Sequence, residues 1–146
     1  MPDFTIDQVK NIIGEIEMGF RVFYHKESGE LLQVPGDGLD GMEGFEEEEE
    51  KLEENFSDYT ELRKMDSRES FQIMESFAEQ LSDRNPLKHR LFSALSQNRP
   101  FARFKQEIDH AGIFRDQWFD FKMEYQLEWY SERIERNNRY AENEEE

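Results

Sequence analysis

The first part of the chain repeats its hydrophobic residues at the three- and four-residue spacing of an amphipathic helix. The repeated positions are Ile6, Val9, Ile13 and Ile16. Thr5 precedes them and Gln8 follows Thr5 by three residues, which is the pattern of a capping box at a helix N-terminus. Gly19 can end the helix. We therefore predict a helix between Thr5 and Gly19.

Alternation replaces this helical spacing directly after Gly19. Phe20, Val22 and Tyr24 occupy every second position, as in a β-strand with one buried face. The sequence KESGE then offers a turn, and LLQV returns as a second strand that a proline stops. Because an isolated hairpin is marginally stable in water, it must pack on helices or gain a third strand. The segment DYTEL, around residues 59–62, is the candidate for that strand.

The segment between the hairpin and this candidate strand contains few hydrophobic residues. Residues 36–58 contain four glycines and eleven Asp or Glu, a composition that cannot form a core. We predict a flexible acidic loop over 36–57, with weak order from about residue 36 to residue 54. Its glutamate run is open to a frayed, solvated helix, because Glu favours helix while its like charges repel. Residues 140–146 predict a disordered acidic tail.

The C-terminal half predicts four helices, the first three of which have clear starts. Asp66 and Glu69 form a second capping box, Asn85 followed by Pro86 begins the next helix, and Pro100 opens the third. We expect the residues at helical spacing to be buried. They are Phe71, Met74, Phe77, Ala78, Leu81, Leu87, Leu91, Ala94, Leu95, Phe101, Phe104, Ile108 and Ala111.

The last helix begins near Asp116 and carries two apolar stripes on separate sides. The first stripe, which we expect to face the core, is Trp118, Phe121, Tyr125 and Trp129. The second stripe is Phe119, Met123, Leu127, Tyr130 and Ile134. Gln126 falls in a polar gap between them. A helix that is apolar on two sides packs against two separate surfaces. It is therefore either the central layer of the domain or a core helix that also binds a partner.

These elements predict a mainly helical α+β fold. It consists of an N-terminal helix, a small antiparallel β-hairpin with or without the third strand, and four C-terminal helices. A chain of 146 residues has the size of one domain, so we expect a single domain over 1–146.

The amino-acid composition excludes several classes of protein but does not indicate an activity. Aromatic residues make up 14% of the chain, which argues against general disorder. The absence of cysteine excludes disulfides, thiolate catalysis and Cys-based zinc sites. No apolar run approaches the ~20 residues of a membrane helix, and the N-terminus lacks the pattern of a signal peptide. We expect a soluble, cytoplasmic protein without a membrane partner.

Charge is distributed unevenly along the chain. The net charge is −17, yet residues 84–139 carry 11 basic and 8 acidic residues, and residues 86–106 contain no acidic residue. Such asymmetry indicates where a partner could bind. We identify a basic face on the helices of this stretch as the candidate binding site, formed by Lys88, Arg90, Arg99, Arg103 and Lys105. A solvated polar surface without a partner is the other interpretation.

Other chemistries have weak patterns in this sequence. The segment DGLDG lacks the ligand spacing and the closing glutamate of a calcium loop, and the three histidines fall on different predicted elements. Asp109 and His110 are neighbours near a helix end, but successive helical residues point about 100° apart, so Asp109 is poorly placed to orient the ring. We therefore expect no catalytic residue, no metal site and no cofactor.

Four segments of the chain resemble, in the same order, the bacterial uncharacterised protein family 0158. They are FYHKESGELLQV, ESFQIMESFAEQLSD, LFSALSQNRPFARFKQEIDHAG and DQWFDFKMEYQLEWY, and their most specific parts are RPFARFK and DQWFDFK. The resemblance covers most of the chain outside the acidic loop and tail. It implies a bacterial protein with a small hairpin and a helical C-terminal half, and it carries over no catalytic residue.

The function that these observations favour is binding. We expect a small accessory or interaction protein without catalysis that binds a macromolecule, a protein in preference to nucleic acid, through the basic face. The second stripe of the last helix is the next candidate surface, with a homodimer through Phe119, Met123, Leu127 and Tyr130. The alternatives are a regulatory nucleic-acid-binding protein that uses the same basic face and, third, an enzyme of an unrecognised type.

Overall fold

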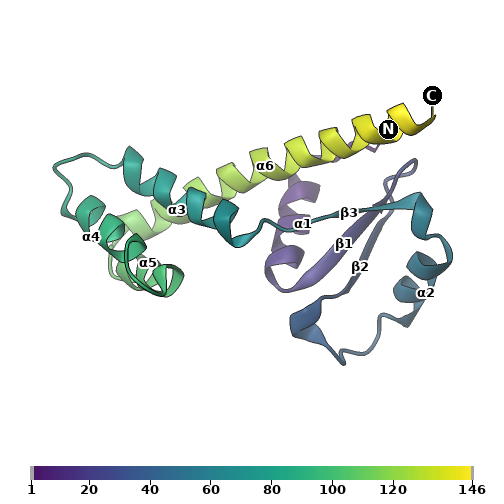
Figure 1. Ribbon diagram of the computed structural model, residues 1–146, viewed down its shortest axis with the longest axis horizontal. Coiled ribbons are helices and arrows are strands. Elements are labelled where there is room, and N and C mark those ends of the chain that lie inside the picture. The colour runs from purple at the N-terminus through teal and green to yellow at the C-terminus, as the bar shows by residue number, and fades with distance from the viewer. Residues whose placement is uncertain (1, 146) are drawn as a thin grey trace. The chain divides into compact units, whose positions relative to one another are not determined.

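A computed structural model describes the backbone of residues 2–145 and the side chains of residues 2–142 (Figure 1). Contacts group the chain into two compact units, residues 1–64 with 126–146 and Met65–Tyr125. Within the described residues, six α-helices accompany one three-stranded sheet. The mainly helical α+β fold is thus confirmed. The single domain stays a prediction, and each unit is described by itself.

The sheet of the first unit has its strands in the order β2-β1-β3. They are β1 (Phe20–His25), β2 (Leu31–Pro35) and β3 (Tyr59–Leu62). Both neighbours run antiparallel to β1, so the hairpin and its third strand are confirmed. Gly29 has a φ of 77° in the turn between β1 and β2, a conformation that glycine adopts without strain.

The central strand β1 is buried on both of its faces. On one face, Phe23 belongs to a buried cluster with Leu32, Val34 and Tyr59. Val22 and Tyr24 are buried as well, and they point to the opposite face because successive side chains of a strand alternate. The sheet therefore needs an apolar cover on each side.

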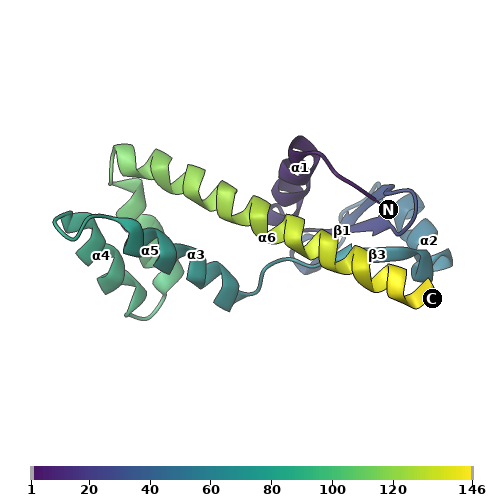
Figure 2. The same cartoon turned by 90° about the horizontal axis from the view of Figure 1, so that it is seen from above.

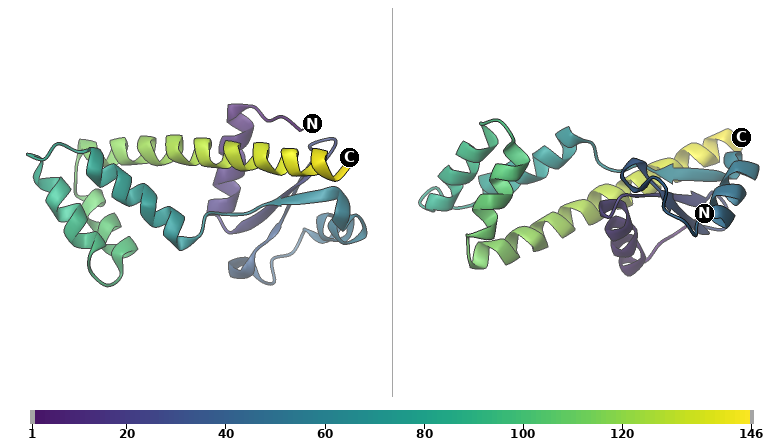
Figure 3. Two further views of the ribbon diagram at one scale, coloured as in Figure 1. Left: turned by 45° about the horizontal axis from the view of Figure 1, so that its top comes forward. Right: turned by 90° about the horizontal axis from the view of Figure 1, so that it is seen from below.

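Helices supply these two covers (Figures 1 and 3). The helix α1 (Ile6–Glu17) contacts β1, and Phe4, just before it, packs edge-on against Tyr24. Its predicted capping box is present, since Thr5 accepts from the backbone N–H of Gln8. On the other face, α2 (Glu46–Glu54) contacts β2, and its Leu52 packs against the Phe23 cluster.

The acidic segment therefore contains regular structure. Its glutamate run forms α2, which is the helix that the sequence left open as an alternative to an irregular loop. Two 3₁₀ helices, η1 (Asp37–Leu39) and η2 (Phe56–Asp58), lie before and after α2. The flexibility of residues 36–57 stays a prediction.

The helix α6 (Ile113–Glu145) contributes residues 126–145 to the first unit. The Tyr24 hydroxyl donates to Oδ1 of Asn138 at 3.4 Å. Gln126, which the sequence placed in a polar gap, is buried instead, and its Nε2 donates to Oε1 of Glu17 at 2.8 Å. The helix includes residues 140–145, where the sequence predicted a disordered tail. Throughout the described residues, no helix is both long enough and apolar enough to span a membrane.

The second unit is a group of helices (Figure 2). It consists of α3 (Ser67–Gln80), α4 (Pro86–Leu95), α5 (Pro100–Asp109) and residues 113–125 of α6. Trp118 of α6 lies between Phe77 of α3 and Phe104 of α5, at 5.4 and 4.8 Å between ring centroids. Both pairs are edge-to-face, a favourable geometry for aromatic rings. The predicted inward turn of these rings is confirmed.

Two residues predicted for the core are exposed, and the prediction is wrong for both. Ile6 is 67% exposed and Phe101 is 44% exposed. Each lies in the first turn of its helix, at the edge of the apolar stripe. The residues three positions later, Val9 and Phe104, are the ones that become covered.

The two stripes of α6 are also less uniform than predicted. In the first stripe Trp118 is buried, whereas Trp129 is only half-buried. In the second stripe Phe119 is 45% exposed, while Tyr130 and Ile134 are buried. Tyr130 is therefore not accessible to a second copy in this structure. The homodimer through Phe119, Met123, Leu127 and Tyr130 stays a prediction.

A glycine turn at the end of the sheet yields a stability prediction. Gly36 donates its N–H to the carbonyl of Gly19 at 3.0 Å, and a Cβ on Gly36 would lie 2.3 Å from that oxygen. Gly36→Ala should therefore lower the free energy of unfolding by about 1–3 kcal/mol, because the two turns must separate. The control Gly38→Ala meets no atom within 4 Å and should change it by less than about 0.5 kcal/mol. Urea unfolding measures both variants, and equal effects would contradict the contact.

Candidate functional site

The carboxylate-free stretch folds into a helical hairpin made of α4 and α5 (Figure 2). Asn85 begins it, because its Oδ1 accepts from the N–H of Leu87 at 3.0 Å, and Pro86 takes the first helical position. Six apolar residues of the two helices turn inward and are buried: Leu87, Leu91, Ala94, Leu95, Phe104 and Ile108. The polar residues between them are left on the outside.

A polar hollow of about 270 Å³ lies on this hairpin. We call it the α4–α5 hollow; its lining residues are His89, Arg90, Ser93, Ala94, Gln97, Arg103, Gln106 and Glu107. Two guanidinium groups and several neutral hydrogen-bond donors thus surround one carboxylate. A hollow with this lining suits a ligand that offers oxygen acceptors.

The one carboxylate of the hollow is paired. Arg90 Nε lies 3.3 Å from Oε2 of Glu107, and both side chains are substantially exposed. An exposed ion pair of this kind contributes only about 0–1 kcal/mol. Arg90 can therefore exchange Glu107 for an incoming anion at small cost.

Arg103 is held on the connection between the two helices. Its Nε donates to the carbonyl of Asn98 at 2.7 Å, and its Nη2 donates to Oδ1 of the same residue at 3.1 Å. These bonds fix the guanidinium of Arg103 beside the hollow. They also use part of its donor capacity, so Arg103 is both a structural and a candidate binding residue.

Arg99 has an unusual backbone conformation. Its φ of 53° and ψ of 51° are left-handed, and within the described residues it is the one non-glycine residue with positive φ. It also precedes Pro100, and residues before proline favour extended backbone. Such strain costs on the order of 1–3 kcal/mol and is concentrated at functional positions. The side chain of Arg99 is exposed.

Lys88 has a structural role instead of lying free on a basic face. Its side chain is only 18% exposed, and its Nζ donates to the carbonyls of Glu79 and Leu81 and to Oδ1 of Asp83, at 3.1, 3.1 and 2.7 Å. The ammonium thus satisfies carbonyls at the C-terminus of α3. Its hydrogen bond also lowers the pKa of Asp83 below the ordinary value.

Lys105 lies away from the α4–α5 hollow. It follows Arg103 by two residues on α5, which places it roughly 200° around the helix. It follows the exposed Phe101 by four residues and so shares that side of the helix. The structure therefore brings together Arg90 and Arg103 in the lining of the hollow. Arg99 precedes Arg103 by four residues and is not part of this lining, and Lys88 and Lys105 are separate from it as well. Whether any of the five binds a partner stays a prediction.

The residues considered for acid–base chemistry have structural partners. The ring Nδ1 of His110 lies 2.8 Å from the carbonyl of Gln106, and Asp109 pairs with Arg115 at 3.4 Å. Asp109 therefore does not orient the ring of His110. Across the part of the chain that the structure describes, no group of three His, Asp or Glu side chains is arranged to hold a metal ion.

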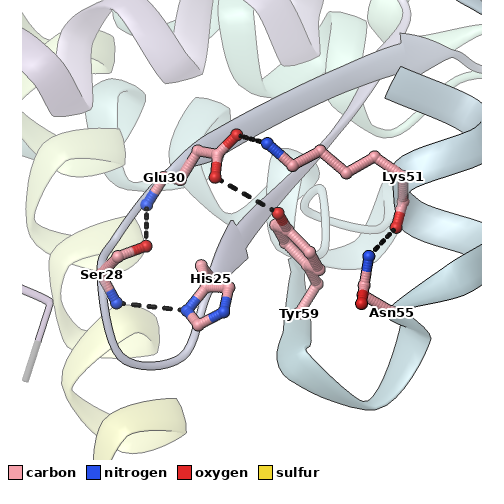
Figure 4. Close-up of polar contacts among 6 residues, drawn as sticks. All are labelled: His25, Ser28, Glu30, Lys51, Asn55 and Tyr59. Carbon is pink, nitrogen blue, oxygen red and sulfur yellow. Dashed lines mark hydrogen bonds and ion pairs between the residues drawn. The ribbon is translucent and has the colours of Figure 1, made fainter. Parts of the chain in front are cut away.

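A second polar cluster surrounds the hairpin turn of the first unit (Figure 4). Glu30 pairs with Lys51 of α2, and the Tyr59 hydroxyl donates to Oε2 of Glu30 at 3.4 Å. The hydrogen bond from Lys51 lowers the pKa of Glu30, while that of Lys51 is raised. His25 packs edge-on against Tyr59 with ring centroids 5.2 Å apart. This cluster fastens α2 to the strands of the sheet.

Comparison with known proteins identifies the family. The sequence model of the Uncharacterised protein family (UPF0158) matches residues 7–146, and the chain belongs to this family. No curated protein and no solved structure matches the chain. The resemblance inferred from the sequence is thus confirmed, while the assignment of a function depends on the geometry.

The capping role of Lys88 is testable. Lys88→Met should lower the free energy of unfolding by about 1–3 kcal/mol near neutral pH, because three hydrogen bonds to a charged donor are lost. The pKa of Asp83 is lowered in the folded state, so its contribution is present above the unfolded pKa and lost as the pH falls through the folded pKa. The variant should lose this acid-dependent part. The control is Lys105→Met at an exposed position, and equal unfolding curves for the two variants would contradict the cap.

The hairpin turn depends on a nitrogen of His25 that accepts hydrogen bonds. Its Nδ1 accepts from the N–H groups of Glu27 and Ser28 at 3.1 and 3.2 Å, so the ring proton lies on Nε2. His25→Asn places an oxygen at the same distance along the side chain, whereas His25→Leu removes the acceptor. We expect the leucine variant to be less stable than the asparagine variant by about 1 kcal/mol in urea unfolding. The opposite order would show that apolar packing of residue 25 against Tyr59 matters more than the hydrogen-bond acceptor.

Proposed function

We propose that this member of the family is a non-catalytic interaction protein that binds an acidic segment of another protein in the α4–α5 hollow. The observation that supports this most is the lining of the hollow, in which two guanidinium groups and neutral donors surround a single, loosely paired carboxylate. Guanidinium groups bind carboxylates with two parallel hydrogen bonds, which provides both affinity and orientation. As a protein of this kind we expect it to be bacterial and cytoplasmic.

The strained conformation of Arg99 supports the same surface. Glycine would adopt this backbone at no steric cost, yet an arginine with an exposed side chain occupies it. An arginine at such a position is expected where its side chain is used. Together with Arg90 and Arg103, it would give the proposed binding surface three guanidinium groups in a chain whose net charge is −17.

A protein partner suits this surface better than nucleic acid does. A net charge of −17 repels a long polyanion such as nucleic acid over more of its length than a short acidic segment, although screening confines this repulsion to about 8 Å at physiological salt. The hollow has a volume of only about 270 Å³, enough for one or two side chains. Its lining also lacks Phe, Tyr and Trp, on which unpaired bases stack.

Regulatory nucleic-acid binding is the second candidate function. The observation that favours it is the connection of α4 to α5 by residues 96–99, with Arg99 and Arg103 at the start of the second helix. Helix-turn-helix proteins use a turn of similar length and read DNA with the N-terminal residues of the second helix.

A binding assay with defined probes separates these functions. A fluorescein-labelled peptide of glutamate and serine should bind at low ionic strength and dissociate as salt increases. The double variant Arg90→Gln, Arg99→Gly should weaken its binding about tenfold, a loss of about 1.4 kcal/mol. The control Lys10→Gln removes a charge from an exposed position on α1 and should leave binding unchanged. Arg99→Gly alone should not lower the melting temperature, because glycine relieves the left-handed strain.

Three results would overturn the proposal. They are the absence of peptide binding at low salt, equal binding by the double variant and the parent chain, and tighter binding of an oligonucleotide than of the peptide. The last result, if abolished by the same double variant, would replace the protein partner with nucleic acid.

A further inference from the structure

A second hollow, of about 630 Å³, lies at one end of the sheet in the first unit. It is bordered by the end of α1, the start of β1, the turn after β2 and the segment that leaves β3. Its volume is in the range of about 300–1,000 Å³ that is typical of small-molecule sites. All of its lining residues belong to the first unit. The α4–α5 hollow has no part in it.

Two glycine turns keep this hollow open. Gly36 and Gly19 are in direct backbone contact, through the 3.0 Å hydrogen bond from the Gly36 N–H to the Gly19 carbonyl. Gly19 has a φ of 106°, which favours glycine. Gly38 also lines the hollow, and a Cβ there would meet no atom within 4 Å. Close backbone contact without side chains leaves space that a ligand can occupy.

The floor of the hollow is apolar. Ile16 and Leu62 line it and are both buried, and the half-buried ring of Phe20 adjoins them. Binding of an apolar group on this floor would be favourable, because it removes apolar surface from water.

The charges around the hollow are of two kinds. Arg21 is neutralised, because its Nε and Nη2 donate to the two carboxylate oxygens of Glu61 at 2.9 and 3.0 Å. Arg63 and Lys64 are exposed, and within the described residues neither side chain has a hydrogen-bond or ion-pair partner. Asp37, the remaining charged residue of the lining, acts on Arg21 and helps raise its pKa. Two unpaired cations therefore stand beside an apolar floor.

We propose that this hollow binds a small organic anion in which a phosphate or carboxylate group is joined to an apolar portion. Arg63 and Lys64 hold the anionic group, and Ile16 and Leu62 contact the apolar portion. Arg21 is already paired with Glu61 and serves to fix the wall of the hollow. The proposal is independent of the proposed function and extends the protein's binding capacity to small molecules.

Amide NMR of the labelled full-length chain tests this site. Phenyl phosphate and benzoate are the probes, and inorganic phosphate and phenol supply the anionic and apolar halves separately. We expect a saturable shift of the amide signals of Gly19, Gly36 and Gly38 with at least one probe, while those of Gly44 and Gly112 stay in place. The probe that binds more tightly distinguishes phosphate from carboxylate.

Substitutions at exposed positions complete the test. The double variant Arg63→Gln, Lys64→Gln should weaken the binding of the better probe at least about tenfold. The charge control Arg68→Gln, on α3, should bind it unchanged. Because these side chains are exposed, the variants should keep the parent's pattern of glycine signals, which verifies the fold.

Four results of these experiments would contradict the proposed site. The site does not exist if neither probe shifts the three glycine signals at millimolar concentration, or if the double variant binds as well as the parent. Inorganic phosphate that saturates at the same concentration as phenyl phosphate would reduce the hollow to an adventitious anion contact and overturn the proposal. Phenol that binds as tightly as phenyl phosphate would show that the cationic residues do not contribute to binding, and this result would also overturn the proposal.

Discussion

The fold of the first unit depends on the burial of one strand from both sides. Because β1 is central, Phe23 needs a cover on one face and Val22 with Tyr24 needs one on the other. The helix α1 supplies one cover, and on the other face Leu52 of α2 packs against the Phe23 cluster. The most acidic segment of the chain is thus part of the structure of the sheet. Its glutamates remain hydrated while one leucine and one lysine hold it in place.

In the second unit, aromatic packing determines which polar groups are available. Trp118 between Phe77 and Phe104 draws one side of α3, α5 and α6 inward. The opposite sides must then carry the charged residues, and from Pro86 to Gln106 these are basic, with Glu107 and Asp109 following at the end of α5. The α4–α5 hollow follows from this segregation, because Arg90 and Arg103 occupy the outer positions of adjoining helices.

Local signals made most of the secondary structure predictable from the sequence. The two capping boxes, the Asn85–Pro86 start and the alternation of β1 involve residues close in the chain, and each is present. The partners of long charged side chains could not be predicted in this way. Lys88 binds carbonyls at the end of another helix, and Arg103 binds the preceding connection. The spacing of the residues indicates the side of the helix on which each one lies. It does not indicate which helix ends or loops lie within reach of its side chain.

The hollow at the end of the sheet had no sequence signal, because its walls come from three separate segments of the chain and its space arises from backbone contact between two glycines. The role of the acidic segment in covering the sheet was missed for a related reason. Its helix contains a single leucine among glutamates, and one residue does not form a hydrophobic pattern. A periodic pattern detects covers made of several apolar residues. It does not detect one made of Leu52 alone.

The position of α2 has a consequence for the behaviour of the protein at high concentration. β2 is an edge strand, and an edge strand offers unpaired backbone groups to which another molecule could add a strand. A run of five glutamates begins the helix that lies on β2, and Pro35 removes an amide donor at the end of the strand. Two copies that approached edge to edge would bring two such runs together and repel each other. The acidic helix consequently disfavours strand pairing between two copies along the β2 edge of the sheet.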